Sequence, residues 1–154
     1  MRCFMKKIWK NLFYLFLPIV IGSMVGLIIK NFINYQEIVK PPLAPPKILF
    51  PIAWTIIYLL MGLAYMLLHQ EKIPKIAKVL YYSQLFVNAL WSIIFFIFHN
   101  YFLSFIWILL LDYLVFMMIY QFYKIKKGAA YLNILYAGWI IFATYLTGAI
   151  WLLN

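Results

Sequence analysis

Cysteine and acidic residues are the scarcest features of this sequence. Of its 154 residues, one is a cysteine (Cys3) and three are Asp or Glu. A single cysteine excludes an intrachain disulfide and any metal site built from several cysteines. The sequence also lacks a paired-carboxylate arrangement, a Ser-His-Asp arrangement and a phosphate-binding loop, so ordinary hydrolytic chemistry has no candidate residues. We therefore predict no metal site, no obligatory cofactor and no dedicated catalytic residues.

Charge of either sign is also rare, whereas apolar residues are abundant. Charged residues make up 10% of the chain and hydrophobic residues 68%, while about a quarter of residues are charged in ordinary soluble domains. The formal net charge of +10 would suit a nucleic-acid partner. The basic residues, however, form short clusters between apolar runs, as membrane anchors do. The sequence predicts an integral membrane protein with lipid, and no nucleic acid, as its partner.

Five apolar segments are long enough to cross a membrane, which needs about twenty helical residues per span. They lie near residues 12–29, 48–68, 79–98, 102–122 and 131–153. Barrel strands would be about ten residues long and alternate in polarity, and backbone groups in lipid must be satisfied within the protein. The predicted fold is an all-α, five-transmembrane-helix bundle that forms a single domain over residues 1–154.

The distribution of basic residues predicts the orientation of the bundle. Ten of the thirteen lie before the first span, between the second and third spans, or between the fourth and fifth spans. The other side keeps Lys30, Lys40 and Lys47. Because cytoplasmic segments are enriched in Lys and Arg, we expect a cytoplasmic N-terminus and an outside C-terminus.

The segment KPPLAPPKILFPIAWTIIY (40–58) combines a stiff loop with an aromatic helix face. Proline fixes φ and disfavours helix in the residue before it, so the prolines predict a rigid, non-helical lid. Trp54, Tyr58 and Met61 recur at i, i+4 and i+7 and share one helix face. A lid leading into an aromatic face suits a binding pocket; the alternative is that prolines cap the helix and the aromatics only pack. The lid prolines are Pro41, Pro42, Pro45 and Pro46.

The third apolar segment has a polar and aromatic stripe. Gln84, Asn88 and Trp91 lie at i, i+4 and i+7, and amide groups in hydrocarbon need partners, so the stripe should face the bundle interior. It either lines a pocket or joins helices by hydrogen bonds worth roughly 0.6 kcal/mol each. The fifth segment has a second stripe of residues spaced three and four apart, with a small residue beside an indole. Its members are Tyr136, Trp139, Ala143 and Thr147.

Two further features leave alternatives open. Asp112 is the acidic residue within a predicted span, which makes it a functional candidate; it either bonds Tyr113, Trp107 or another helix, or is a neutral carboxyl. Gly22 and Gly26 have the GxxxG spacing that allows helices to approach closely. They serve packing either within the bundle or at a dimer interface.

Several ordered motifs together resemble the tryptophan-rich sensory protein family, also called the translocator protein or peripheral-type benzodiazepine receptor (TspO/MBR) family. They are KPPLAPP (40–46), PIAWTIIYLLMG (51–62), QLFVNALWSIIFF (84–96), YAGWIIFATYL (136–146) and the terminal Leu-Asn pair. The resemblance covers most of the chain. It implies a five-helix bundle, usually dimeric, with a pocket closed by the first loop, and it places the protein in a bacterial cell membrane.

Members of this family bind porphyrins and haem-like tetrapyrroles, and some bind sterols or benzodiazepine-type drugs. By motif, Trp54 and Trp139 resemble the paired indoles of the family pocket. Tyr58, Asn88 and Ala143 resemble further wall residues. The expected ligand is therefore a tetrapyrrole, and Lys40 and Lys47 in the lid are placed to attract its carboxylates.

The sequence departs from the family pattern at two positions of the fifth segment. Leu135 stands where a proline is usual, which puts the family's helix kink in doubt, and Thr147 stands where an asparagine is usual. The sterol-recognition pattern also needs a Tyr followed by Lys or Arg, and no basic residue follows Lys127. The absence of this weak pattern argues against cholesterol binding and leaves sterol binding undecided.

Three functions fit the sequence. The preferred one is tetrapyrrole binding in sensing, transport or metabolism. The enzymatic alternative is light-dependent porphyrin breakdown, in which the excited pigment does the chemistry and Trp54 and Trp139 donate electrons. The third is a scaffold or interaction protein with a vestigial pocket. Saturable binding and a light-dependent product would separate the three.

Overall fold

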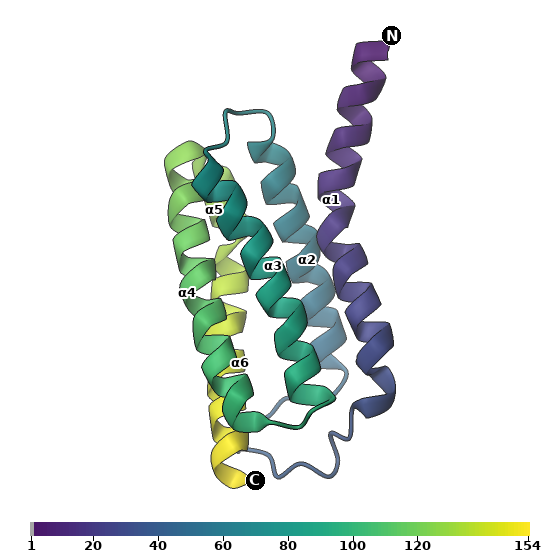
Figure 1. Cartoon of the computed structure of the whole chain (residues 1–154), viewed down its shortest axis with the longest axis vertical. Helices are drawn as coiled ribbons and strands as arrows, with labels where there is room; N and C mark the ends of the chain where they lie inside the picture. Colours follow the sequence, from purple (N-terminus) through teal and green to yellow (C-terminus); the bar gives the residue numbers. More distant parts are fainter. Residues whose placement is uncertain (1) are drawn as a thin grey trace.

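The protein is a bundle of helices in which five spans run the length of the molecule (Figure 1). The computed structural model describes residues 2–154, with side chains from residue 5 onward. All five spans are long and apolar enough to cross a membrane, the fifth being formed by α5 and α6 together. The all-α membrane fold is thus confirmed. The elements are α1 (Arg2–Ile29), the 3-10 helix η1 (Lys30–Phe32), α2 (Leu49–Leu68), α3 (Lys75–Phe96), α4 (Tyr101–Ile125), α5 (Lys127–Leu132) and α6 (Ile134–Leu153).

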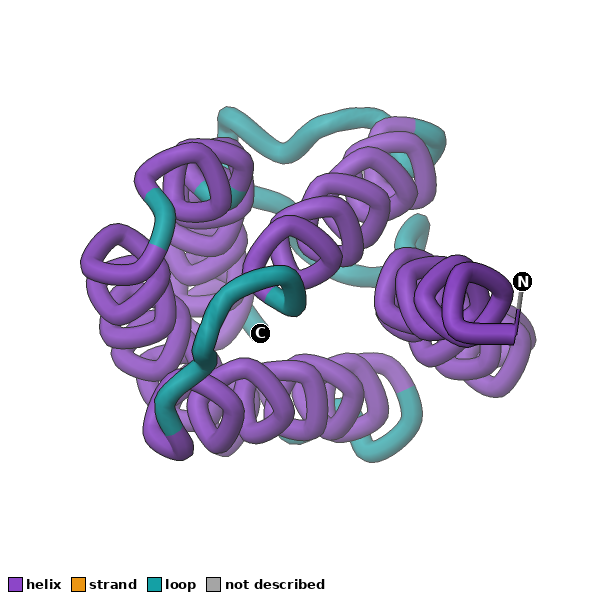
Figure 2. Tube along the Cα trace, turned by 90° about the horizontal axis from the view of Figure 1, so that it is seen from above, coloured by secondary structure: helices purple, strands orange, loops and turns teal. Residues whose placement is uncertain are grey.

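The helices close into a ring around a common core. Helix α1 packs mainly on α2 and also on α3; α3 packs on α4, α4 on α5 and α6, and α2 on α5. Seen along the bundle, α1 lies at one side of the ring (Figure 2). The N-terminus and the α2–α3 loop lie at one end, whereas the α1–α2 loop and the C-terminus lie at the other (Figure 1). We call these the basic end and the loop end, because ten of the thirteen basic residues belong to segments of the first.

Local sequence signals set several helix boundaries. Pro74 is the N-cap residue of α3 and has an extended conformation with ψ of 150°, the non-helical backbone that is usual at that position. Helix α4 begins after Asn100, whose side chain accepts a hydrogen bond from the Leu103 backbone at 3.0 Å; Asn is among the preferred N-cap residues. His99 just before it has φ of 51°, which turns the chain sharply between α3 and α4.

The observed helices extend beyond the apolar segments predicted from the sequence. Helix α1 begins at Arg2 instead of near residue 12, and α3 begins at Lys75 instead of near residue 79. The extra turns hold lysines, which are good helix formers. Hydropathy marks the part of a helix that fits the hydrocarbon core, while the backbone hydrogen bonds continue past that limit.

The fifth span is interrupted at Asn133, which separates α5 from α6. Its backbone N–H bonds Ala130 O at 3.0 Å, and its side chain donates to Ala129 O at 2.9 Å. The side chain thereby takes the carbonyl that a regular helix would give to the backbone of residue 133, a known way for Asn to compete with helix. The interruption is present although Leu135 replaces the family's usual proline. The asparagine side chain supplies it by another route.

The interior of the basic-end half, where α2, α3 and α4 meet, is tightly packed. The rings of Tyr65 and Tyr81 stack with centroids 4.1 Å apart, and Tyr81 lies 6.2 Å from Phe122. Met118 and Phe122 have no exposed surface. Offset aromatic pairs of this kind stabilise cores by about 0.5–1.5 kcal/mol beyond the burial itself. The other half of the bundle is hollow.

Candidate ligand-binding site

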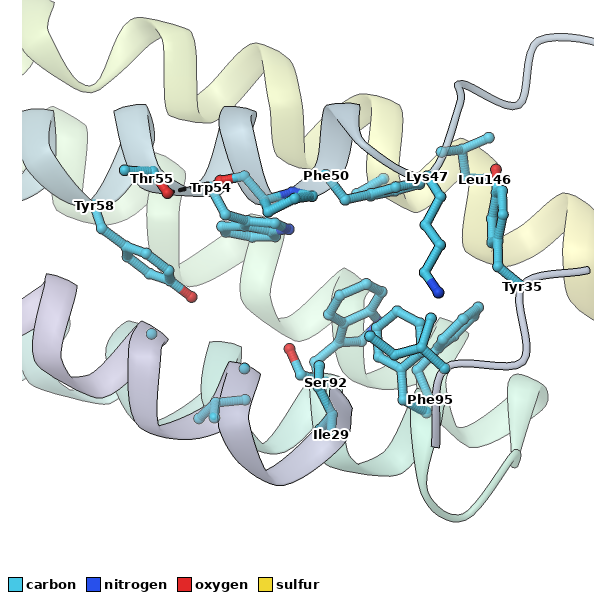
Figure 3. Close-up of a pocket in the computed structure, with 18 of the residues that line it drawn as sticks. Ile29, Tyr35, Lys47, Phe50, Trp54, Thr55, Tyr58, Ser92, Phe95 and Leu146 are labelled. Atoms are coloured by element: carbon cyan, nitrogen blue, oxygen red, sulfur yellow. Dashed lines mark hydrogen bonds between the residues drawn. The ribbon is translucent and has the colours of Figure 1, made fainter. Parts of the chain in front are cut away.

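A cavity of about 670 Å³ lies between α1, α2, α3 and α6 in the loop-end half of the bundle (Figure 3). Its volume falls in the range of about 300–1,000 Å³ that is common for small-molecule sites. Most of the wall is apolar and aromatic, including Phe50, Trp54, Tyr58, Trp91 and Phe95. Such a wall suits a large, flat and mainly apolar ligand.

Three hydroxyl groups of the wall already have protein partners. Tyr35 donates to Pro45 O at 2.7 Å, Thr55 to Pro51 O at 2.7 Å, and Thr147 to Ala143 O at 2.7 Å. Because these donors are occupied, they offer a ligand little free hydrogen-bonding capacity. The wall therefore acts mainly through shape and aromatic surface.

Lys47 is the charged residue of this wall. It follows the last lid proline, and Figure 3 shows its side chain extending across the cavity mouth, between Phe50 and the group formed by Ser92 and Phe95. Lys40, the other basic lid residue, lies outside the cavity wall, with Nζ 4.5 Å from the centroid of the Tyr35 ring. Of the two lysines expected to attract a ligand's carboxylates, Lys47 is thus the one with access to the cavity.

Trp54 and Tyr58 form a stacked pair on α2, with ring centroids 5.4 Å apart. Their i, i+4 spacing places them on one helix face, as predicted. Gly22 of α1 makes room for this pair, since a Cβ at that position would meet the Tyr58 ring. Gly26 lines the cavity with nothing within 4 Å of its missing Cβ. Of the two alternatives for the GxxxG pair, Gly22 therefore serves packing within the bundle.

A buried chain of hydrogen bonds lies behind the Tyr58 end of the cavity. Tyr58 donates to Asn88 Oδ1 at 3.2 Å, Asn88 Nδ2 donates to the Tyr136 hydroxyl at 2.9 Å, and Tyr136 donates to Gln84 Oε1 at 2.8 Å. Gln84 Nε2 then donates to Met61 Sδ at 3.2 Å. The chain links α2, α3 and α6 and satisfies the amides that the sequence stripe placed in the membrane. It fixes the Tyr58 hydroxyl and, with it, one end of the cavity.

Not all of the predicted ligand-binding residues reach the cavity. Trp54, Tyr58, Trp91 and Ala143 line it. Asn88 lies one bond behind Tyr58. Trp139 also lies outside the wall; its ring packs edge-on against Trp54 at 6.3 Å and against Phe50 at 6.0 Å. The paired indoles are therefore in contact, with Trp54 in front and Trp139 behind it.

The lid loop (residues 33–48) closes the mouth through residues other than its prolines. Ile33, Tyr35, Lys47 and Ile48 line the cavity, whereas Pro41, Pro42, Pro45 and Pro46 do not. The loop is tied down at Val39, whose backbone N–H and C=O both bond the Asn154 side chain, at 3.1 and 3.0 Å. The prolines thus stiffen the loop, and the terminal asparagine fastens it to α6.

Asp112 lies away from the cavity and bonds another helix, one of the alternatives that the sequence left open. The Thr144 hydroxyl donates to Asp112 Oδ2 at 2.8 Å, while Trp107 Nε1 bonds Val87 O at 3.0 Å. Asp112 thus joins α4 to α6. In the part of the chain that the structure describes, no group of three His, Cys, Asp or Glu residues could hold a metal ion.

Sequence reasoning did not identify the contribution of α1 to the cavity. Its lining residues have no aromatic ring and no charge, so no pattern separates them from lipid-facing residues. They are Ile19, Gly22, Ser23, Val25, Gly26 and Ile29. The GxxxG spacing was the available signal, since small residues mark a close approach, but spacing alone does not show whether the neighbour is a helix or a ligand.

Comparison with known proteins agrees with this architecture. The model of the TspO/MBR family matches residues 14–152. The tryptophan-rich protein TspO of Archaeoglobus fulgidus is 37% identical over 122 residues, covering 78% of this chain and 79% of that protein. The TspO of Chlorobaculum tepidum is 32% identical over 78% of each chain, and a tryptophan-rich sensory protein of Cereibacter sphaeroides is 38% identical over 48% of this chain and 47% of its own. This integral membrane protein belongs to the TspO/MBR family.

Proposed function

We propose that the protein binds a tetrapyrrole with free carboxylates, of the porphyrin or haem type, in the cavity beneath the lid loop. A porphyrin is a flat apolar disc with anionic propionates at one edge. The cavity offers matching chemistry, with indole and phenol rings along its wall and one ammonium group at its mouth (Figure 3). The presence of Lys47 in an otherwise uncharged wall is the observation that carries the proposal.

Each group has a distinct role in this proposal. The Trp54 and Trp91 rings provide faces or edges for the macrocycle, each aromatic pair contributing on the order of 1 kcal/mol beyond burial. Tyr58, held by Asn88 at 3.2 Å, limits how deeply the disc enters. Lys47 pairs with a propionate at the mouth, where water and lipid headgroups are near. Binding of this kind supports sensing, transport or metabolism of the pigment.

A comparison of charged and esterified ligands tests the role of Lys47. Purified protein in nanodiscs is titrated with protoporphyrin and with its dimethyl ester, with tryptophan fluorescence as the readout. We expect Lys47→Gln to weaken protoporphyrin binding about five- to tenfold, as loss of one charge-assisted contact predicts, and to leave ester binding unchanged. Lys40→Gln is the matched control and should behave like the wild type. Equal losses for acid and ester would contradict the proposed pairing.

The indole pair provides a second test of the same site. Trp54→Phe or Trp139→Phe keeps an aromatic ring and should cost about five- to tenfold in affinity. The loss should be larger for Trp54, which lines the cavity, than for Trp139, which packs behind it. A double Phe variant with unchanged affinity would show that the ligand binds elsewhere.

Light-dependent porphyrin breakdown is a second candidate, favoured by the contact between Trp54 and Trp139. Their centroids are 6.3 Å apart, so an electron that Trp54 gives to the excited porphyrin would be replaced from Trp139, which is then left oxidised by one electron. Prolonged illumination of the complex should then yield a new pigment product with the wild type. The double Phe variant should bind protoporphyrin weakly and yield none, and product formation at the original rate would exclude the tryptophan route.

We further propose that the basic end faces the cytoplasm of a bacterial cell and that the protein forms a homodimer. The charge distribution supports the orientation through the enrichment of basic residues on the cytoplasmic side, and the family resemblance supports the dimer. Reporter fusions after Asn154 and near Lys126 should report opposite sides of the membrane. Native mass spectrometry from nanodiscs should give twice the monomer mass.

A further inference from the structure

A second, smaller hollow lies at the basic end of the bundle, whereas the main cavity lies in the loop-end half. Its volume is about 290 Å³, and it opens where α1 passes the end of α2 and the α2–α3 loop. The lining residues come from α1, α2, the loop and α3. They are Tyr14, Tyr65, His69, Glu71, Lys72, Ile73 and Lys78. The tetrapyrrole proposal leaves this hollow without a role.

The hollow is rich in hydrogen-bond donors and positive charge. Lys72 and Lys78 line it, and the His69 ring packs against Tyr14 with centroids 4.4 Å apart. Ammonium groups, an imidazole N–H and a phenol are donors. Glu71 is the one acid in the lining, and Lys126 Nζ lies 3.4 Å from its Oε1, so its charge is partly neutralised from outside the hollow.

Positive charges surround His69 at this place. Partial burial, followed by the charges of Lys10 and Lys78, lowers the pKa of the His69 imidazole below its ordinary value. The groups around it are Lys10 and Tyr14 from α1, Tyr65 from α2, Glu71 and Lys72 from the loop, and Lys78 from α3. Like charges held together in this way favour a bound anion, which offsets their repulsion.

The position of the hollow indicates the chemistry of that anion. It lies around the end of the second span at Leu68 and the start of the third at Lys75, where the headgroups of a surrounding bilayer are expected because the apolar spans end there. Basic pockets between helices on the cytoplasmic side are a known way to bind anionic headgroups. We propose that this hollow binds a phosphate group, with Lys72, Lys78 and His69 as its donors.

Measurement of retained lipid distinguishes specific binding in the hollow from attraction to general surface charge. Protein from nanodiscs containing phosphatidylcholine and phosphatidylglycerol is analysed by native mass spectrometry for retained lipid. Lys72→Gln with Lys78→Gln should reduce retained phosphatidylglycerol roughly tenfold, as loss of two charge-assisted hydrogen bonds to the phosphate predicts. Lys124→Gln with Lys127→Gln is the matched control. It removes the same charge at the same end, but those amines lie over the Tyr120 and Tyr123 rings, at 4.2 and 5.5 Å, and retention should stay within about twofold of the wild type.

His69 provides an independent readout by NMR. It lines the hollow, and the Lys72→Gln, Lys78→Gln variant serves as the reference for the surface potential of the disc. A bound phosphate should raise the His69 titration midpoint more in the wild type than in that variant, because a nearby anion favours the charged imidazole. If phosphatidylglycerol discs alone produce this rise, the ligand is a headgroup. If inorganic phosphate in phosphatidylcholine discs also does so, the site accepts free phosphate.

Two results would overturn the proposal. One is an equal loss of phosphatidylglycerol from both double variants, which would mean that the lysines act only as general surface charge. The other is a His69 midpoint that responds to phosphate and to phosphatidylglycerol equally in the wild type and in the Lys72→Gln, Lys78→Gln variant. The tetrapyrrole affinity, measured in parallel, should be the same in wild type and in the Lys72→Gln, Lys78→Gln variant, since the main cavity is at the other end.

Discussion

Tyr65 and Tyr81 stack at 4.1 Å at the basic end of the bundle, whereas Trp54 and Tyr58 stack at 5.4 Å beside open space at the loop end. Both halves use the same kinds of side chain and lie on the same helices. In the first, α4 and α5 supply Met118, Phe122 and Ala129 to fill the interior. In the second, α1 supplies glycines and small aliphatic residues and leaves a cavity. The difference shows that aromatic residues mark a ligand site only where the facing helix leaves room for one.

Replacing a core ring in the packed half should have the largest effect. Phe122→Ala removes a side chain with no exposed surface and leaves a void among rigid neighbours, which should lower the free energy of unfolding by about 3 kcal/mol. Phe95→Ala is the matched variant in the hollow half, where one side of the ring already faces the cavity, and it should cost at least 1 kcal/mol less. Unfolding in denaturing detergent measures both, and equal losses would remove the distinction between the halves.

The glycines of α1 should respond differently although they are one helical turn apart. In Gly22→Ala the new Cβ would meet the Tyr58 ring, so the ring must move into the cavity or the helices must separate. We expect a loss of about 1–2 kcal/mol in stability and of roughly tenfold or more in protoporphyrin affinity.

Gly26→Ala is the control, because nothing lies within 4 Å of its Cβ position. It should leave binding within about twofold of the wild type and raise helix stability by up to about 1 kcal/mol. If both variants bound protoporphyrin alike, the fit between Gly22 and Tyr58 would not determine the shape of the cavity.

Asn88 and Asp112 are hydrogen-bonded polar residues within the spans that lie outside the cavity wall. Replacing them tests the surroundings of the cavity without changing its lining. Asn88→Leu deletes the link between Tyr58 and Tyr136 and leaves buried hydroxyls with fewer partners, at a cost of about 1–2 kcal/mol. Asp112→Asn keeps a partner for Thr144 and lies away from the cavity. Protoporphyrin titration should show the larger loss for Asn88→Leu, and the reverse order would move the functional site towards α4.

Releasing the lid loop should have the smallest effect on stability. Asn154→Ala removes two hydrogen bonds to the Val39 backbone, both exposed to solvent, so at most about 1 kcal/mol is expected. Hydrogen exchange at the Val39 amide should nevertheless accelerate several-fold, and bound pigment should dissociate faster. Asn100→Ala, which affects the α4 cap instead, is the control and should leave pigment dissociation unchanged.

The sequence by itself determined the five spans, the all-α fold and the inward-facing stripes. These follow from properties of single segments, namely the length of an apolar run and the 3.6-residue period of a helix. The pairing of Trp54 with Tyr58 and the need of Gln84 and Asn88 for partners are of this kind. The interruption of the fifth span also has a local cause, the side chain of Asn133. The expected sequence signal for a kink there was the family's usual proline, which Leu135 replaces.

The tertiary structure alone decided which stripe residues face empty space. Trp139 and Asn88 lie one residue behind the cavity wall, Lys47 rather than Lys40 has access to it, and Val39 is joined to a residue 115 positions away. Each result depends on the relative rotation and separation of helices that are distant in the sequence. Helical periodicity fixes the face of one helix but says nothing about its distance from the next, and that distance is what separates a packed core from a cavity.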